Sequence, residues 1–117
     1  MNVLNAEVLR ARQCSACEGG VPRCTTLQTR EQLEEFQNWK LSNDGDRIYR
    51  KWVFSDFCFA FEFMSKVARL AEDEQHHPDL HLVQYLSVSV ELYTHAIHGL
   101  SENNSILASK IDAIVSG

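Results

Sequence analysis

Residues 55–78, SDFCFAFEFMSKVARLAEDEQHHP, carry the clearest regular pattern in the chain. Apolar side chains recur at steps of three and four residues, which is the spacing of one face of an α-helix. Ser55 or Asp56 can cap the first turn, and Pro78 marks the end because the residue before a proline avoids the α conformation. The stretch predicts a long helix whose apolar face comprises Phe57, Ala60, Phe61, Met64, Val67, Ala68 and Ala71.

The remaining side chains of this helix also carry expectations. Four phenylalanines occupy successive odd positions, which go round a helix rather than along one face. Most of these rings are expected in the core or in a subunit interface, with Phe59 and Phe63 as the better interface candidates. Cys58 lies in the same apolar pattern and is expected in the core.

Strand patterns lie on both sides of the helix. Before it, apolar residues alternate around the turn sequence SNDGD (42–46), and an Asp-Gly pair in that setting predicts a β-hairpin. After it, a second antiparallel pair is predicted. The alternating residues are Trp39, Leu41, Ile48, Trp52 and Phe54 in the first pair and Leu80, Leu82, Val88, Val90 and Leu92 in the second, with Tyr85 at the end of the third strand.

Two further helices complete the predicted order. Thr29-Arg30-Glu31-Gln32 has the T-x-x-Q form of a capping box and predicts a helix from Thr29 to about Asn38. Ser101 caps a last helix with an apolar stripe of Leu107, Ile111 and Ile114. Four strands and three helices in this order predict an α+β, two-layer sandwich, a four-stranded antiparallel sheet with three helices on one face. The sheet edges are open to pairing, so self-association is expected.

The length of 117 residues predicts one domain. Residues 1–28 show no sustained period apart from a helical turn around Glu7–Arg12, and are expected to form an irregular lead-in or arm before the domain at 29–117. The net charge of −5 gives no electrostatic footprint for nucleic acid. Without an apolar run of about 20 residues or a secretory signal, the chain is expected to be soluble and cytoplasmic, with no membrane contact.

The cysteines leave one alternative open. Cys14 and Cys17 form a C-x2-C pair with Cys24 nearby, which could hold zinc. A structural zinc site needs four ligands, and no fourth partner has a suitable local spacing. We therefore expect reduced thiols and no metal.

All five histidines lie between positions 76 and 98. Three of them, His76, His77 and His95, fall where the end of the long helix and the end of a strand can meet at one rim of the sheet. Imidazole donates and accepts protons near neutral pH, so this group predicts acid/base catalysis, with a histidine metal site and a structural role as alternatives. His81 and His98 are expected to be surface residues.

The same residues carry a resemblance to a known family. Glu72-x3-His76-His77-Pro78, followed by Tyr85 and His95, is similar to the characteristic motif of pterin-4α-carbinolamine dehydratases. The similarity extends over about 100 residues. It takes in residues 48–57, 63–72, 76–82, 90–95, 99–103 and 106–112, and includes Cys17-Glu18-Gly19-Gly20 near the N-terminus.

The resemblance implies an enzyme that removes water from 4a-hydroxytetrahydrobiopterin, the product left by aromatic amino acid hydroxylases, to give quinonoid dihydropterin without a metal or organic cofactor. It implies catalytic roles for His76, His77 and His95, with His76 and His95 as the acid/base pair and His77 orienting the pterin. Glu72 would support the histidines. The residues implied to shape the pterin site beside it are Gln75, Pro78, Tyr93 and Thr94.

The family also implies partners. Members form dimers or tetramers, and some act as dimerisation cofactors of transcription factors or as assembly factors, so a non-catalytic partner-binding protein is the alternative function. One position departs from the family: Asn104 stands where an aspartate is usual, in the run Gly99-Leu100-Ser101-Glu102-Asn103-Asn104. An amide cannot supply the negative charge that would hold a histidine protonated, so a modest loss of activity is expected.

Overall fold

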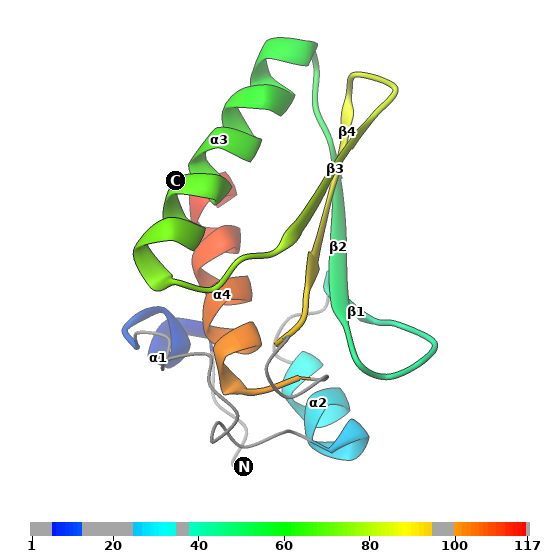
Figure 1. The fold of residues 1–117 in the computed structure, drawn as a ribbon, viewed down its shortest axis with the longest axis vertical. Coiled ribbons are helices and arrows are strands. Elements are labelled where there is room, and N and C mark those ends of the chain that lie inside the picture. Colours follow the sequence, from blue (N-terminus) through cyan, green and yellow to red (C-terminus); the bar gives the residue numbers. More distant parts are fainter. Residues whose placement is uncertain (1–5, 13–24, 35–37, 95–99, 117) are drawn as a thin grey trace.

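In the computed structural model, a four-stranded antiparallel sheet carries its helices on one face (Figure 1). The structure describes residues 6–12, 25–34, 38–94 and 100–116. The predicted α+β class and the four strands are confirmed. Within these ranges there are four helices rather than three, because the short turn predicted near Glu7 forms a helix of its own.

The sheet consists of two hairpins joined through their inner strands. The strands β1 (Lys40–Leu41), β2 (Ile48–Val53), β3 (Asp79–Val83) and β4 (Ser87–Leu92) lie in the order β1-β2-β4-β3. Gly45 adopts a φ of 76° in the first turn, a conformation that glycine reaches without a steric penalty. Both predicted hairpins are confirmed, but Tyr85 lies in the β3–β4 turn instead of the strand.

Helix α3 (Phe57–Glu74) confirms the long helix predicted at this position. Asp56 is its N-cap, since its side chain accepts a hydrogen bond from the backbone N–H of Phe59 at 2.8 Å. The buried row follows steps of three and four and comprises Ala60, Phe63, Val67 and Ala71. Met64 and Leu70 are partly buried against the core beside this row, whereas Phe57, Phe61 and Ala68 of the predicted face are exposed.

The position of this row corrects three expectations for α3. Phe63 is a core residue rather than an interface candidate, because its ring packs on Trp52 with centroids 4.8 Å apart. Phe57 and Phe61 point away from the buried row and are about half exposed. Cys58 is exposed as well.

The core lies between the sheet and the pair α3 and α4 (Glu102–Ser116). Strand β4 shows the alternation plainly, since Val88, Val90 and Leu92 are fully buried while the residues between them are half-buried. From the other layer, Leu107 and Ile111 of α4 are fully buried.

Helix α2 (Thr26–Leu33) begins earlier than predicted. Its N-cap is Thr25, whose hydroxyl accepts from Gln28 N while the Gln28 side chain accepts from Thr25 N. The T-x-x-Q pattern occurs at both Thr25 and Thr29, and the second copy lies inside the helix, where the Thr29 hydroxyl donates to the Thr25 carbonyl. The helix ends at Leu33, and residues 35–37 lie outside the described part of the chain.

Helix α1 (Ala6–Arg10) packs against α4. Leu9 is fully buried, and the Arg12 guanidinium pairs with the Glu102 carboxylate at the start of α4. None of the helices in the described residues has the length and apolar character needed to cross a membrane.

Candidate active site

The C-terminal turn of α3 places two adjacent histidines in different environments. Gln75 adopts the left-handed conformation with a φ of 54°, and the His76 N–H donates to the Ala71 carbonyl at 3.1 Å, which closes a Schellman-type cap. The chain reverses at this point. His76 is therefore turned inward and is only 2% exposed, whereas His77 is exposed.

His76 belongs to a buried polar network built from three segments. Its Nε2 lies 2.9 Å from Asn104 Nδ2. Asn104 Oδ1 accepts from the Thr94 hydroxyl at 2.9 Å and from the Ser101 backbone N–H at 2.9 Å. The Thr94 and Ser101 hydroxyls are 3.0 Å apart. All four residues are at most 2% exposed, so these groups satisfy each other without bulk water.

The start of α4 positions Asn104 in this network. Ser101 precedes the helix as predicted, and the Asn104 side chain reaches back to the Ser101 N–H in the manner of a capping box. The Asn104 backbone N–H also donates to the Ser101 carbonyl at 3.1 Å. The helix start thus fixes the carboxamide beside His76.

His77 pairs with Glu72, the acidic residue one helical turn before the cap. His77 Nε2 and Glu72 Oε1 are 2.7 Å apart, and a carboxylate oxygen accepts hydrogen bonds, so Nε2 carries a proton. Both side chains are more than half exposed. The contact orients the imidazole and leaves Nδ1 as the ring nitrogen that Glu72 does not engage.

Three of the other predicted site residues in the described part of the chain lie around the two histidines. The Gln75 side chain donates to the Glu72 carbonyl at 2.6 Å, and Pro78 is half-buried directly after the two histidines. Thr94 belongs to the His76 network. His95 and His98 lie outside the described residues, so their positions stay predictions.

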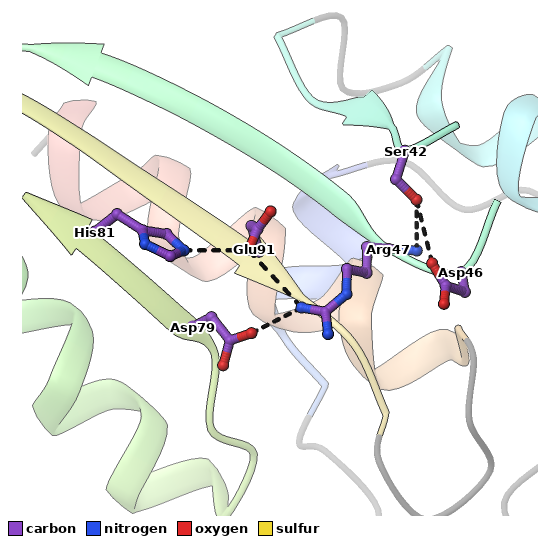
Figure 2. Close-up of polar contacts among 6 residues, drawn as sticks. All are labelled: Ser42, Asp46, Arg47, Asp79, His81 and Glu91. Carbon is purple, nitrogen blue, oxygen red and sulfur yellow. Dashed lines mark hydrogen bonds and ion pairs between the residues drawn. The ribbon is translucent and has the colours of Figure 1, made fainter. Parts of the chain in front are cut away.

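Tyr93 lies with a charged cluster on the sheet face opposite the helices. The Arg47 guanidinium stacks over the Tyr93 ring, 4.8 Å from its centroid. Arg47 is hydrogen-bonded to Asp79 at 2.7 Å and paired with Glu91 at 3.7 Å, and His81 lies 3.2 Å from Glu91. Figure 2 shows these contacts between the strands. The structure therefore brings Thr94 to His76 but places Tyr93 against Arg47.

Arg47 directly precedes β2 and holds the start of that strand beside the start of β3. The hydrogen bond to Asp79 raises the pKa of Arg47 above its ordinary value, so the guanidinium stays charged. Its backbone N–H donates to the Ser42 hydroxyl, which in turn donates to Asp46 in the β1–β2 turn (Figure 2). The cluster ties three strands together at the edge where Pro78 enters β3.

Sequence reasoning missed Arg47. The reason for its place appears only with the strand register, in which Asp79 and Glu91 are directly opposed and their like charges are destabilising unless a cation lies near them. The open-face location of His81 agrees with its predicted surface position.

No three histidine, cysteine or carboxylate side chains come together as a metal site in the residues that the structure describes. Cys14, Cys17 and Cys24 fall outside these residues, so the zinc alternative is not addressed there.

Comparison with known proteins adds to this geometry. The sequence profile of a family described as Pterin 4 alpha carbinolamine dehydratase matches residues 22–114. The chain belongs to this family. The family identified from the sequence motif is therefore confirmed.

Individual relatives of the dehydratase family agree. A Rickettsia bellii (strain OSU 85-389) protein named for the same dehydratase is 42% identical over 106 residues, covering 91% of this chain and 93% of its own length. The mitochondrial pterin-4-alpha-carbinolamine dehydratase 2 of Arabidopsis thaliana is 40% identical over 109 residues, covering 91% of this chain and 58% of its own.

A solved structure shares the fold. The crystal structure of a transcriptional coactivator/pterin dehydratase from Brucella melitensis superposes with a TM-score of 0.74 at 34% identity, covering 80% of this chain and 98% of that one.

Proposed function

We propose that this chain dehydrates 4a-hydroxytetrahydrobiopterin to quinonoid dihydropterin by histidine acid/base catalysis. Family membership over residues 22–114 supports the dehydratase activity. The observation that supports a histidine mechanism is the α3 cap, which holds His76 in a buried network and His77 on the Glu72 carboxylate. A protein that served only as a scaffold would not need two imidazoles held in this way.

The reaction consists of a proton gained at one atom and a proton lost at another. The C4a–O bond breaks while an acid protonates the leaving oxygen, which departs as water. A base removes the proton from a pterin ring nitrogen, whose electrons form the new C=N bond. Each positioned group contributes roughly 10²- to 10⁴-fold in such proton transfers. Atoms and electrons balance in this reaction without an oxidant, a metal or an organic cofactor.

The described residues supply particular parts of this chemistry. Glu72 orients His77 by accepting from Nε2–H, so proton exchange takes place at His77 Nδ1. His95, which directly follows Thr94 of the buried network, is the second proton-transfer residue. The backbone conformation of Gln75 sets the direction of both histidines, and Pro78 carries the chain from them into β3.

The proposed substrate and product indicate which reactions would precede and follow this one. Aromatic amino acid hydroxylases leave tetrahydropterin as its 4a-hydroxy form, so the proposed reaction returns the cofactor toward a state that a reductase can restore. A hydroxylase would supply the substrate and a dihydropterin reductase would consume the product.

The test is the dehydration rate of enzymatically generated 4a-hydroxytetrahydrobiopterin, followed by the absorbance of the quinonoid product in the presence of a chelator. The wild-type protein is expected to accelerate the reaction, and His77→Gln and His95→Gln are each expected to lose roughly 10²-fold or more. His81→Gln is the matched control, because it removes an imidazole from the opposite face of the sheet, and it should keep the wild-type rate.

Two results would contradict the proposal. A wild-type rate equal to the uncatalysed one would remove the enzyme and leave partner binding as the function. Equal losses in His81→Gln and His77→Gln would show that the histidines act through stability and not through proton transfer.

A further inference from the structure

The direction of each hydrogen bond around Asn104 is fixed by one backbone group. The Ser101 N–H can only donate, and it meets the Asn104 side chain at 2.9 Å. The amide atom at this position must therefore be the oxygen. The same oxygen accepts the Thr94 hydroxyl proton, and the Ser101 hydroxyl then donates to Thr94.

With the oxygen assigned, Asn104 presents its NH2 group to His76. The separation of 2.9 Å between Asn104 Nδ2 and His76 Nε2 is that of a hydrogen bond in which Nε2 must be the acceptor. A proton on Nε2 would meet the protons of the amide. The alternative, a reversed amide, would leave the buried Ser101 N–H facing another donor, an arrangement that costs on the order of 1–3 kcal/mol.

We infer that Asn104 is a positioning residue that holds His76 as a neutral imidazole with its proton on Nδ1. The inference concerns the ring state, and only its catalytic meaning rests on the proposed dehydratase function. The hydrogen bonds that orient the Asn104 amide come from Ser101 and Thr94, and both of these residues are at most 2% exposed.

This assignment changes the role predicted for His76. A ring whose Nε2 lone pair is occupied by an amide N–H does not take up a proton there, so His76 is not one of the acid/base pair. It acts instead as a fixed hydrogen-bond donor through Nδ1–H. The two proton transfers of the proposed reaction then belong to His77 and His95.

Three ion pairs involve charged side chains at the end of α3 and along α4. Glu72 pairs with His77 at the end of α3, and Glu74 of α3 pairs with Lys110 of α4. At the start of α4, Glu102 pairs with Arg12. The contact on which the inference rests is the one between His76 Nε2 and the neutral Asn104 amide.

The test is the long-range ¹H–¹⁵N spectrum of the histidine rings in uniformly labelled, ligand-free protein near neutral pH. Protonated and unprotonated ring nitrogens have distinct ¹⁵N shifts, so each ring reports its own state. Wild-type His76 is expected to show an unprotonated Nε2 and a protonated Nδ1. In Asn104→Asp the carboxylate keeps the Ser101 and Thr94 donors but can only accept from His76, so both ring nitrogens should become protonated.

His77 provides the internal control, because its Glu72 contact does not involve Asn104 and its pattern should be the same in both proteins. A proton on Nε2 of wild-type His76 would overturn the inference, as would an identical His76 pattern in the two proteins. If Asn104→Asp does not fold, the wild-type spectrum alone decides.

The spectrum also separates this inference from the proposed function. It is recorded without pterin, so a protein that shows the expected His76 pattern but no dehydratase activity would sink the proposed function and support the ring assignment. An active enzyme with a proton on His76 Nε2 would do the reverse.

Discussion

Asp112 shows how one partly buried carboxylate connects a helix to the sheet. Its Oδ1 accepts from Trp39 Nε1 at 2.9 Å and from the Arg50 guanidinium at 2.6 Å. Burial raises the pKa of Asp112, and the hydrogen bonds from Trp39 and Arg50 oppose that effect without cancelling it. This single side chain therefore joins α4 to β2 and to the residue before β1.

The raised pKa of Asp112 predicts a pH dependence of stability. The folded protein holds this proton more tightly than the unfolded chain, so the contribution is fully present below the ordinary aspartate pKa and is lost as pH rises through the raised one. Urea unfolding of wild type and Asp112→Asn at about pH 4 and about pH 7 should show the wild-type advantage shrinking at the higher pH. An advantage that grows with pH would contradict this reasoning.

Single residues also mark the limit of what the sequence predicts about the site. Glu72, His76, His77 and Thr94 were predicted from the family motif, and the structure gives each a partner. That His76 is buried while His77 is exposed follows from the left-handed Gln75, and glutamine carries no sequence signal for that conformation. The direction of the Asn104 amide likewise depends on contacts between segments far apart in the chain.

At the scale of elements, the N-cap of α2 can be tested by a single substitution. Thr25→Ala removes the hydroxyl that accepts from Gln28 N and should lower the free energy of unfolding by about 1 kcal/mol. Arg30→Ala, an exposed change in the same helix, is the control and should shift it by less than about 0.5 kcal/mol. Equal effects of the two substitutions would mean that the cap contributes nothing measurable.

The turn between β3 and β4 contains two non-glycine residues in the left-handed region, Gln84 with a φ of 52° and Tyr85 with a φ of 53°. Left-handed backbone costs an L-residue about 1–2 kcal/mol, so Tyr85→Gly should raise the free energy of unfolding by about 1 kcal/mol after the greater freedom of glycine in the unfolded chain is counted. Thermal or urea unfolding measures this.

Tyr85→Ala separates the backbone effect from loss of the ring. The alanine keeps a Cβ, so it should bring no gain, and the Tyr85 ring is mostly exposed in any case. A gain of the same size in both variants would locate the effect in the side chain.

Sequence patterns predicted the elements better than their ends. Alternation and helical spacing gave both hairpins and the long helix because each is a local property of the residues that form it. The start of α2 was wrong by one turn, since the same T-x-x-Q pattern occurs twice and the sequence does not show which copy has its backbone groups free.

At the scale of the whole molecule, the outer side of α3 presents aromatic surface. Phe57, Phe59 and Phe61 are 51%, 54% and 57% exposed, and the rings of Phe57 and Phe61 are neighbours with centroids 6.5 Å apart. Large rings left half in water favour association with another copy. The dimer or tetramer predicted from the sequence stays a prediction, and these rings are its candidate contact.

Sedimentation of the native protein is expected to give a dimer or tetramer. Phe57→Ser combined with Phe61→Ser should weaken self-association by about 2–3 kcal/mol per protomer, because two rings lose their apolar burial. Glu62→Ser, at an exposed position of the same helix, should leave the mass unchanged. A monomeric wild type would rule out this surface as the contact.

Local patterns could not predict which side chains of α3 pack on the buried face of the sheet. Alternation predicted which strand residues share a side, and the buried Val88, Val90 and Leu92 confirm it for β4. Which ring of α3 meets that side depends on how the helix is rotated against the sheet, and Phe63 was misassigned for this reason.

The strand order has a consequence for how the molecule folds. Each hairpin closes a short loop, but the central pairing, from Ile48 to Leu92, encloses α3 and β3. Closing a long loop costs entropy before its contacts repay it, so this step is slow relative to hairpin formation. The network around Asn104 also needs α4 docked on the joined sheet. Refolding chains should therefore form their two hairpins first and regain their dehydratase activity last.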